Sequence, residues 1–416
     1  MLIDHKLSNL SKIGNCHLTG NDAFFEKIST DTRSMSKGDI FLSLKGPNYN
    51  GHDFINIALD KGASCLITEK EIPGETYIKT ENTFLFLEEL AKFQRLNFKK
   101  DIIAITGSNG KTSTKEILYQ LSKKLFENNE VFKSPGNWNN KLGLYLSLLE
   151  LNKKHKLAIF EIGTNAVGEI EELASFLKPN IGVITNIGNS HLEGLKNIQG
   201  VLDEKTDLFS FVALNGTCLM RATESHLKKA EEKIKKRNKM FLQVKETQSF
   251  DQNLEMAKAV ISCLPELKKN NLLLSDEKIN ILKRTSVVAG RQELLIGKNN
   301  VNLIDDTYNA NPESFRAAFK KIKSMPCKNK ICVMGKMSEL GKKTLILQDE
   351  IIEDALKVFD LVLAINLDSK IKDKNFKIVN SQAIYKNLEI YLNEESVILF
   401  KASRSVKMEK IVKLFK

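Results

Sequence analysis

The sequence predicts an α/β protein, because short apolar runs alternate with helix-like stretches along most of the chain. This alternation is typical of parallel sheets whose strands are connected by helices. At 416 residues, the chain is long enough for about two to four domains. With 42% hydrophobic and 27% charged residues, its composition is that of a folded globular protein and excludes a disordered chain.

Three blocks of alternating elements follow one another, and we expect one domain in each: residues 1–98, 99–285 and 286–416. Short apolar runs bounded by turn residues mark the strands, and longer amphipathic stretches mark the helices. The expected strands are at 39–44, 64–68, 101–106, 157–162, 181–187, 302–305, 330–334, 361–365 and 397–400. The expected helices include 52–61, 83–97 and the Lys-rich run 228–239, which we interpret as facing solvent.

The charge and the cysteines indicate the partners and the location. The net charge is +12, but only eight of the 63 basic residues are Arg, so we interpret the surplus as a Lys-rich surface and expect no nucleic-acid partner. A polyanionic small substrate is the next interpretation. The six cysteines are scattered and form no CxxC pair, which argues against a disulfide scaffold or a zinc ribbon. Without an apolar run of ~18 residues or a secretory signal, we expect a cytoplasmic protein with no membrane anchor.

The strongest local signal is a phosphate-binding loop at 103–114, IAITGSNGKTST. A strand leads into a Gly-rich turn and a helix begins directly after it, so backbone N–H groups and the helix N-terminus favour an anion. Lys111 would reach the phosphates, and the Thr112 or Ser113 hydroxyl would bind Mg²⁺. The strict GxxxxGK[ST] pattern fails at Ile105, so this is a variant loop. Its candidate nucleotide-binding residues are Gly107, Ser108, Asn109, Gly110, Lys111, Thr112 and Ser113.

Polar residues follow two other expected strands of the same block. Glu161 lies at the end of LAIFEI, and His191 follows ITNIGNS. Ligands of open α/β sheets bind beyond the carboxyl ends of the strands, and a buried carboxylate needs a partner or a metal. Glu161 is therefore a candidate Mg²⁺ ligand, although a capping or salt-bridged glutamate is the plainer interpretation. By itself, Lys205 is an ordinary helical lysine.

Together, these stretches resemble the Mur ligase family in order and over nearly the whole chain. The similar stretches are TDTR at 30–33, NGHDF at 50–54, TGSNGKT at 106–112, SPGNWNN at 134–140, EIG at 161–163, TNIG at 185–188, HLEG at 191–194, GRQ at 290–292, DDTYNANP at 305–312 and KASR at 401–404. The YNANP segment is most similar to the family member that adds D-Ala-D-Ala. The DNPR-like motif typical of a sister ligase does not occur.

The resemblance implies a fold and an activity. It implies a small α/β N-terminal domain for the UDP end of a UDP-N-acetylmuramoyl-tripeptide, a central P-loop-type domain with a mostly parallel sheet for ATP, and a C-terminal Rossmann-like domain for D-Ala-D-Ala. The implied reaction is an ATP-dependent amide ligation through an acyl phosphate, in cytoplasmic peptidoglycan precursor synthesis. The implied cofactors are ATP, two Mg²⁺ ions and CO₂, and we expect a monomer.

The resemblance also implies roles for individual residues. Lys111, Glu161, His191 and Lys205 would be catalytic, with Lys205 carbamylated by CO₂. Thr112, Glu161, His191 and Lys205 would hold the metal ions. Asn253, Arg291 and Asp306 would contact ATP. The substrate-binding residues would be Arg33, Asn50, His52, Asn137, Asn139, Asn140, Tyr308, Asn309 and Asn311.

The chain departs from the family pattern mainly around 210–253, where we expect a shortened central domain and an altered adenine side of the ATP site. None of the departures removes a group that is assigned to the chemistry. Three alternatives stay open: another Mur-type amino-acid ligase, a nucleotide-binding scaffold without turnover, and a nucleic-acid-binding ATPase that rests only on net charge.

Overall fold

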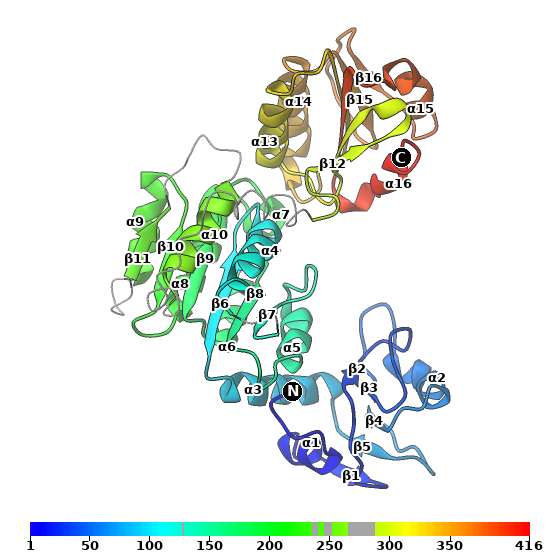
Figure 1. Cartoon of the computed structure of the whole chain (residues 1–416), viewed down its shortest axis with the longest axis vertical. Helices are drawn as coiled ribbons and strands as arrows, with labels where there is room; N and C mark the ends of the chain where they lie inside the picture. Colours follow the sequence, from blue (N-terminus) through cyan, green and yellow to red (C-terminus); the bar gives the residue numbers. More distant parts are fainter. Residues whose placement is uncertain (127–128, 235–239, 245–251, 265–287) are drawn as a thin grey trace. The chain divides into compact units, whose positions relative to one another are not determined.

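The structure, a computed structural model, describes residues 1–126, 129–234, 240–244, 252–264 and 288–416 (Figure 1). Its strands form three sheets, one of five strands and two of six. The chain packs as two compact units, one made of residues 1–102 and 126–160 and the other of residues 103–125 and 161–416. Within the described ranges, no helix is long and apolar enough to cross a membrane.

The first unit contains the five-stranded sheet. Across it run β1 (His17–Thr19), β5 (Tyr77–Lys79), β4 (Cys65–Thr68), β3 (Ile40–Leu42) and β2 (Ile28–Ser29), with only the β1 pairing antiparallel. Its helices are α1 (Leu7–Ile13), the 3₁₀ turn η1 (Gly51–Phe54), α2 (Ile55–Asp60), α3 (Thr83–Asn97) and α5 (Lys141–Leu149). The buried Gln94 amide of α3 donates to the carbonyls of Leu148 and Leu151 at 3.1 and 3.0 Å. These bonds tie α3 to carbonyls at and just beyond the C-terminal end of α5.

The middle sheet positions the candidate site. Its order is β11 (Met240–Gln243), β10 (Thr217–Met220), β9 (Ile181–Ile184), β6 (Asp101–Thr106), β8 (Leu157–Glu161) and β7 (Val131–Lys133). The pairs β10–β11, β9–β10, β6–β9 and β7–β8 are parallel. The associated helices are α4 (Lys111–Ser122), α6 (Glu169–Leu177), α7 (Leu192–Leu195), α8 (Ile198–Phe211), α9 (Glu224–Ile234) and α10 (Gln252–Ser262). Parallel strands end at one edge of the sheet, so Thr106, Glu161 and Ile184 end β6, β8 and β9 at that edge.

The third sheet lies within the second unit. Its order is β12 (Glu293–Ile296), β13 (Asn302–Asp306), β17 (Ser396–Lys401), β14 (Asn329–Gly335), β15 (Leu361–Ile365) and β16 (Phe376–Ile378), and only the edge strand β12 pairs antiparallel. Its helices are α13 (Pro312–Lys323), α14 (Thr344–Leu356), α15 (Ala383–Leu388) and α16 (Glu409–Val412). Short 3₁₀ turns are η2 (Lys298–Asn300), η3 (Gly341–Lys343), η4 (Glu389–Tyr391) and η5 (Arg404–Val406).

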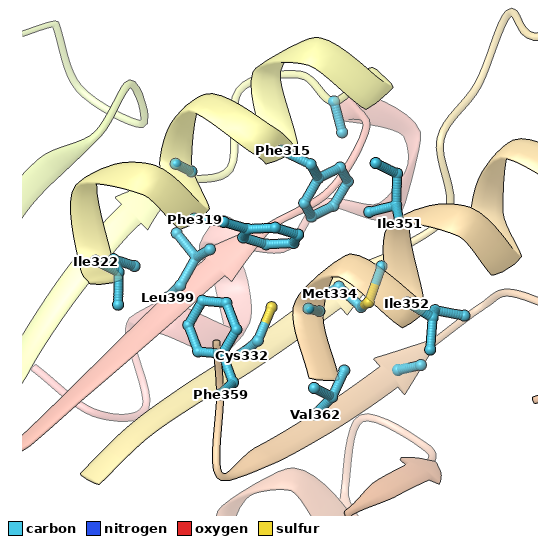
Figure 2. Close-up of a cluster of buried hydrophobic side chains, with 14 of the residues drawn as sticks. Phe315, Phe319, Ile322, Cys332, Met334, Ile351, Ile352, Phe359, Val362 and Leu399 are labelled. Carbon is cyan, nitrogen blue, oxygen red and sulfur yellow. The ribbon is translucent and has the colours of Figure 1, made fainter. Parts of the chain in front are cut away.

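Alternate residues of these strands enter two separate cores. Figure 2 shows the core on the α13 and α14 face, where Phe315 and Phe319 of α13 pack with Phe359 over Cys332 and Leu399. The intervening strand residues face a second core, which includes residues of α15 and α16. Because both faces are covered, the central strands β14, β15 and β17 are buried along most of their length rather than alternately exposed.

The expected α/β class with mostly parallel sheets is confirmed, and each of the nine expected strands is present. Among the described residues, the structure adds eight short strands that were not expected, namely β1, β2, β5, β7, β10, β11, β12 and β16, and other differences lie at element ends. Strand β9 stops at Ile184, three residues before the expected end, because the chain there turns to support the phosphate loop. The expected helix at 52–61 begins as the 3₁₀ turn η1. The expected helix at 228–239 is α9 as far as Ile234, and its remainder and the expected boundary at 285 lie outside the described residues.

Candidate functional site

The phosphate loop joins β6 to α4 at the carboxyl edge of the middle sheet. Gly107 and Gly110 have φ angles of +146° and +79°, which favour glycine. A Cβ atom on Gly107 would lie 1.9 Å from Thr185 Oγ1, and one on Gly110 would lie 2.4 Å from Asn253 Oδ1. The φ angles of both positions favour glycine, and at Gly107 the short side chain and backbone of Thr185 also leave no room for a Cβ atom. The distance at Gly110 also shows that Asn253, which the resemblance assigns to ATP binding, lies against the phosphate loop.

The segment after β9 supports this loop through hydrogen bonds. The backbone N–H of Asn109 donates to Asn186 Oδ1 at 2.9 Å, and Ser108 Oγ donates to the Gly188 carbonyl at 3.0 Å. Thr185 Oγ1 donates to the Asn109 carbonyl at 2.6 Å. The polar residues that follow β9 thus hold the loop in its anion-binding conformation.

Lys111 begins α4 and folds over the loop, with its Nζ donating to the Gly107 carbonyl at 2.6 Å. Burial lowers the pKa of Lys111, and Arg291 lowers it further, whereas Glu161 and Glu339 raise it. A cation in this place lies where the phosphates of a nucleotide need neutralising. The neighbouring hydroxyl residue Ser113 follows in the first turn of the same helix.

Thr112 and Glu161 meet as expected at the end of β8. Thr112 Oγ1 donates to Glu161 Oε2 at 2.7 Å, and both side chains are buried. The same carboxylate oxygen lies 3.6 Å from Nζ of Lys115, a fully buried lysine of α4 that the sequence analysis missed. Lys115 follows Lys111 by one helical turn, and this spacing was the available signal.

His191 and Lys205 lie in different surroundings: His191 is paired with a carboxylate, whereas Lys205 is fully buried in a helix. His191, at the start of α7, has Nδ1 at 2.9 Å from a carboxylate oxygen of Glu339. This contact lowers the pKa of Glu339. Lys205 is fully buried in α8, and burial followed by the charge of Lys111 lowers its pKa well below the ordinary lysine value. Among the described residues, no group of three or more His, Cys, Asp and Glu could by itself hold a metal ion.

Residues around α13 contact the phosphate loop and the segment that follows β9. The Asn311 and Asn109 amides exchange hydrogen bonds, with Asn311 Nδ2 donating at 2.8 Å and Asn109 Nδ2 donating at 3.2 Å. Glu313, a residue not expected from sequence, accepts from the backbone N–H and the Nδ2 of Asn189 at 3.0 and 2.9 Å. Asn311 and Glu313, near the start of α13, therefore contact the phosphate loop and the segment after β9 that supports this loop.

The other residues expected on this side form their own cluster. The Arg291 guanidinium lies 4.0 Å from the centre of the Tyr308 ring, close enough for a cation–π contact. Asp306 accepts from the buried Lys401 Nζ at 2.7 Å, and that ammonium also donates to the Asn309 carbonyl at 3.0 Å. Asp306 is thus held by an ion pair that the sequence did not indicate.

The residues expected to bind the UDP end lie in the first unit. Arg33 is exposed and forms a bidentate pair with Asp31, which lowers the pKa of Asp31 to about 2. The buried His52 bridges two partners: Nδ1 lies 2.9 Å from Asn50 Oδ1, and Nε2 accepts from the Glu69 N–H at 3.1 Å.

The Asn-rich turn after β7 also belongs to the first unit. Asn140 caps α5 by accepting from the Gly143 N–H at 2.9 Å. Asn137 and Trp138 are exposed, and Asn139 is half-buried between Trp138 and Asn140. The turn therefore presents two amides, those of Asn137 and Asn140, and one indole to solvent, and the Asn140 amide also caps the following helix.

Comparisons with known proteins match three family models in order. These are the Mur ligase family catalytic domain at residues 25–95, the Mur ligase middle domain at 105–281, and the Mur ligase glutamate ligase domain at 290–412. Two similar relatives are both named UDP-N-acetylmuramoyl-tripeptide–D-alanyl-D-alanine ligase. The one from Buchnera aphidicola is 32% identical, with 99% of this chain and 98% of that protein covered. The one from Rickettsia prowazekii is 33% identical, with 94% and 95% covered.

Solved structures agree in fold. MurF from Acinetobacter baumannii superposes with a TM-score of 0.83 at 25% identity, and 99% of this chain and 98% of that chain are covered. MurF from Thermotoga maritima, solved in complex with ADP, has a TM-score of 0.78 at 27% identity, with 94% and 97% covered.

Proposed function

Because the chain belongs to the Mur ligase family, we propose that it joins D-Ala-D-Ala to UDP-N-acetylmuramoyl-tripeptide, with ATP consumed, in peptidoglycan precursor synthesis. The observation that carries this proposal is the near-complete coverage of relatives named for that activity, at up to 33% identity. The phosphate loop geometry supports a nucleoside triphosphate, and the relative from Thermotoga maritima solved with ADP favours ATP.

The reaction must convert a carboxylate, which is a poor electrophile, into one with a good leaving group. A carboxylate oxygen of the tripeptide attacks the γ-phosphorus of ATP, and the bond to the β-phosphate oxygen breaks, which gives an acyl phosphate and ADP. The dipeptide amine then attacks the acyl carbon, inorganic phosphate leaves, and the amine loses a proton. The difficulty is to bring two anions together, so the protein's task is charge neutralisation and alignment.

The residues of the phosphate loop fit this task. The two glycines let the backbone approach an anion closely, and the N-terminus of α4 points positive partial charge at it. Lys111 supplies a positive charge beside the transferred phosphoryl group. The Thr112 hydroxyl and the Glu161 carboxylate, 2.7 Å apart, suit Mg²⁺, which takes one or two protein ligands and completes its shell with phosphates and water. Magnesium bound there would neutralise phosphate charge.

Lys205 is proposed to carry a carbamate. Its lowered pKa favours the neutral amine, which adds CO₂ and releases a proton to give a carboxylate-like anion. We propose that this anion, with His191 and Glu161, holds a second Mg²⁺. Burial of Lys205 supports the assignment, because a buried lysine without a role in charge balance is costly to fold.

The remaining assignments complete the proposal. Asn253, Arg291 and Asp306 would contact ATP, and Tyr308, Asn309 and Asn311 would bind the dipeptide. Arg33, Asn50 and His52 would bind the UDP end, and the substrate-facing turn would contribute Asn137, Asn139 and Asn140. We place the domain boundaries at 98 and 285, and we propose a monomer that acts in the cytoplasm.

The test is ADP release by the purified protein with UDP-N-acetylmuramoyl-tripeptide, ATP and Mg²⁺, together with mass spectrometry of the product. We expect ADP release that depends on D-Ala-D-Ala and a product heavier by the dipeptide minus water. Activity with single amino acids alone would replace this function by that of another Mur-type ligase. Complementation of depleted cells by Lys111→Ala would instead favour a scaffold without turnover.

A further inference from the structure

Glu204 lies directly before Lys205 in α8, and its side chain is as deeply buried as that lysine, at 2% and 1% exposed. Its two carboxylate oxygens accept hydrogen bonds from the backbone N–H groups of Gly168 and Ile170, each at 2.7 Å. These N–H groups belong to the start of α6, where helix geometry leaves donors without partners and favours negative charge. Glu204 therefore fastens α8 to the first turn of α6.

This cap comes from far along the chain, because the residue that begins α6 offers none. Gly168, at the N-cap position, has no side chain and a φ of +92°. A local Ser or Asn at the N-cap would satisfy the Ile170 donor without burying a carboxylate. The long-range bond does more than cap a helix, because it also fixes the distance between two elements.

The fastened segment connects the proposed metal ligands. Residues 163–168 run from the end of β8, where Glu161 lies, to the start of α6. This segment also contacts α7, which follows His191, because a Cβ atom on Gly194 of α7 would lie only 1.8 Å from the Asn165 carbonyl oxygen. The Glu204 carboxylate thus connects α8 to the segment 163–168, which follows Glu161 and packs against α7.

We propose that Glu204 is a positioning residue that holds Lys205 in place to form and keep its carbamate. The inference rests on the proposed function, which assigns that carbamate. Lys205 has four rotatable side-chain bonds, so its terminal atom reaches one defined place only if its backbone is fixed. The two hydrogen bonds of the adjacent residue supply that fixation, as outer partners of metal ligands commonly do.

The experiment compares Glu204→Ala and Glu204→Gln with a matched control, Asn82→Ala. Asn82 also accepts from two N–H groups at a helix start, those of Phe84 and Leu85 at 2.9 and 3.0 Å, but it lies in the first unit. Three quantities are measured: the ¹³C carbamate NMR signal with ¹³C-bicarbonate, Mg²⁺ and a non-hydrolysable ATP analogue; kcat and KM as functions of bicarbonate; and the thermal midpoint.

For Glu204→Ala we expect the carbamate signal and kcat to fall about 10–100-fold at fixed bicarbonate. Added bicarbonate should partly restore both, while KM for D-Ala-D-Ala stays near the wild-type value. Glu204→Gln keeps one acceptor and should lie between Glu204→Ala and wild type. Asn82→Ala should lose thermal stability yet keep the wild-type carbamate signal and bicarbonate response.

A purely structural role for Glu204 would appear as a lowered thermal midpoint with an unchanged carbamate signal and bicarbonate response, and that result would overturn the inference. If Glu204→Ala does not fold, Glu204→Gln decides by the same readouts. Wild-type ligation without any carbamate signal would overturn the inference and leave the proposed function standing. Absence of D-Ala-D-Ala-dependent ADP release in wild type would overturn the function itself.

Discussion

Lys115 and Glu161 form an ion pair that is buried on both sides, beside the hydroxyl of Thr112. Such a pair adds little net stability compared with well-packed apolar residues, but removing one partner leaves a charge in a low-dielectric environment. We therefore interpret Lys115 as the resident counter-ion of Glu161. It pairs with the carboxylate and helps to orient it.

Replacing Lys115 by Met tests this interpretation. We expect the free energy of unfolding to fall by about 3 kcal/mol, because the Glu161 charge loses its buried partner. For a domain of this size, that loss corresponds to a thermal midpoint lower by about 6–12 °C, measured by circular dichroism. The exposed Lys124→Met is the control, and equal melting of the two variants would contradict a role for the pair.

His52 gives a prediction about pH. Burial lowers the pKa of His52 from its ordinary value of 6.5, and neutral Nε2 accepts from the Glu69 N–H. The unfolded chain therefore takes up the proton first, so the stabilisation is present above about pH 6.5 and is lost as the pH falls toward the lowered pKa. We expect His52→Gln to reduce the drop in thermal midpoint between pH 7.5 and pH 5.5. His17→Gln, at an exposed histidine of the same unit, should leave that drop unchanged.

At the scale of elements, the strand–loop–helix unit from β6 to α4 was predictable because its determinants are local. An apolar run, two glycines, a lysine and a hydroxyl residue stand within about a dozen positions, and parallel strands bring Glu161 to the same edge. The hydrogen bonds of Glu204 were not predictable, since their donors Gly168 and Ile170, at the start of α6, lie 36 and 34 positions away. A Glu or Lys on a helix is normally exposed, and only tertiary packing shows which ones are buried.

The loop itself yields a prediction about Gly107. Gly107→Ala places a methyl group against Thr185 Oγ1 at a φ of +146°, so the loop must distort. We expect ATP to bind at least about tenfold more weakly, measured by calorimetry with Mg²⁺ present. Gly74→Ala is the control, because Gly74 also has a positive φ, of +84°, but a Cβ there meets nothing within 4 Å. Unchanged affinity in Gly107→Ala would show that the loop tolerates a side chain.

At the scale of the whole molecule, the expected α/β class is confirmed, and the alternation of apolar runs was sufficient to predict it. The contacts of Asn311 with Asn109 and of Glu313 with Asn189 were not predictable, because they join segments far apart in sequence. Asn309 and Asn311 could be singled out only by resemblance to a family, since amides in a loop before a helix are otherwise typical of caps. Asn311 does cap α13, by accepting from the Ser314 N–H.

Trp138 offers a reporter for the whole enzyme because it is the only tryptophan in the chain. Its side chain is 40% exposed in the Asn-rich turn, where we propose that substrate binds. We expect UDP-N-acetylmuramoyl-tripeptide to shift its fluorescence to shorter wavelength as the indole leaves water, whereas ATP alone leaves the spectrum unchanged. The shift should vanish in Trp138→Phe. A constant spectrum at saturating substrate would remove this turn from the substrate site.

The counter-ion role of Lys115 has a consequence for how Mg²⁺ would bind to this protein. Because the Lys115 ammonium already pairs with Glu161, we expect chelators to leave the chain folded. We also expect free Mg²⁺ to bind weakly when no nucleotide is present. Under the proposed function, Mg²⁺ would bind and leave together with the nucleotide. Under the proposed function, the concentration of the Mg²⁺–ATP complex, rather than that of free Mg²⁺, would then set how fast the phosphate loop is filled.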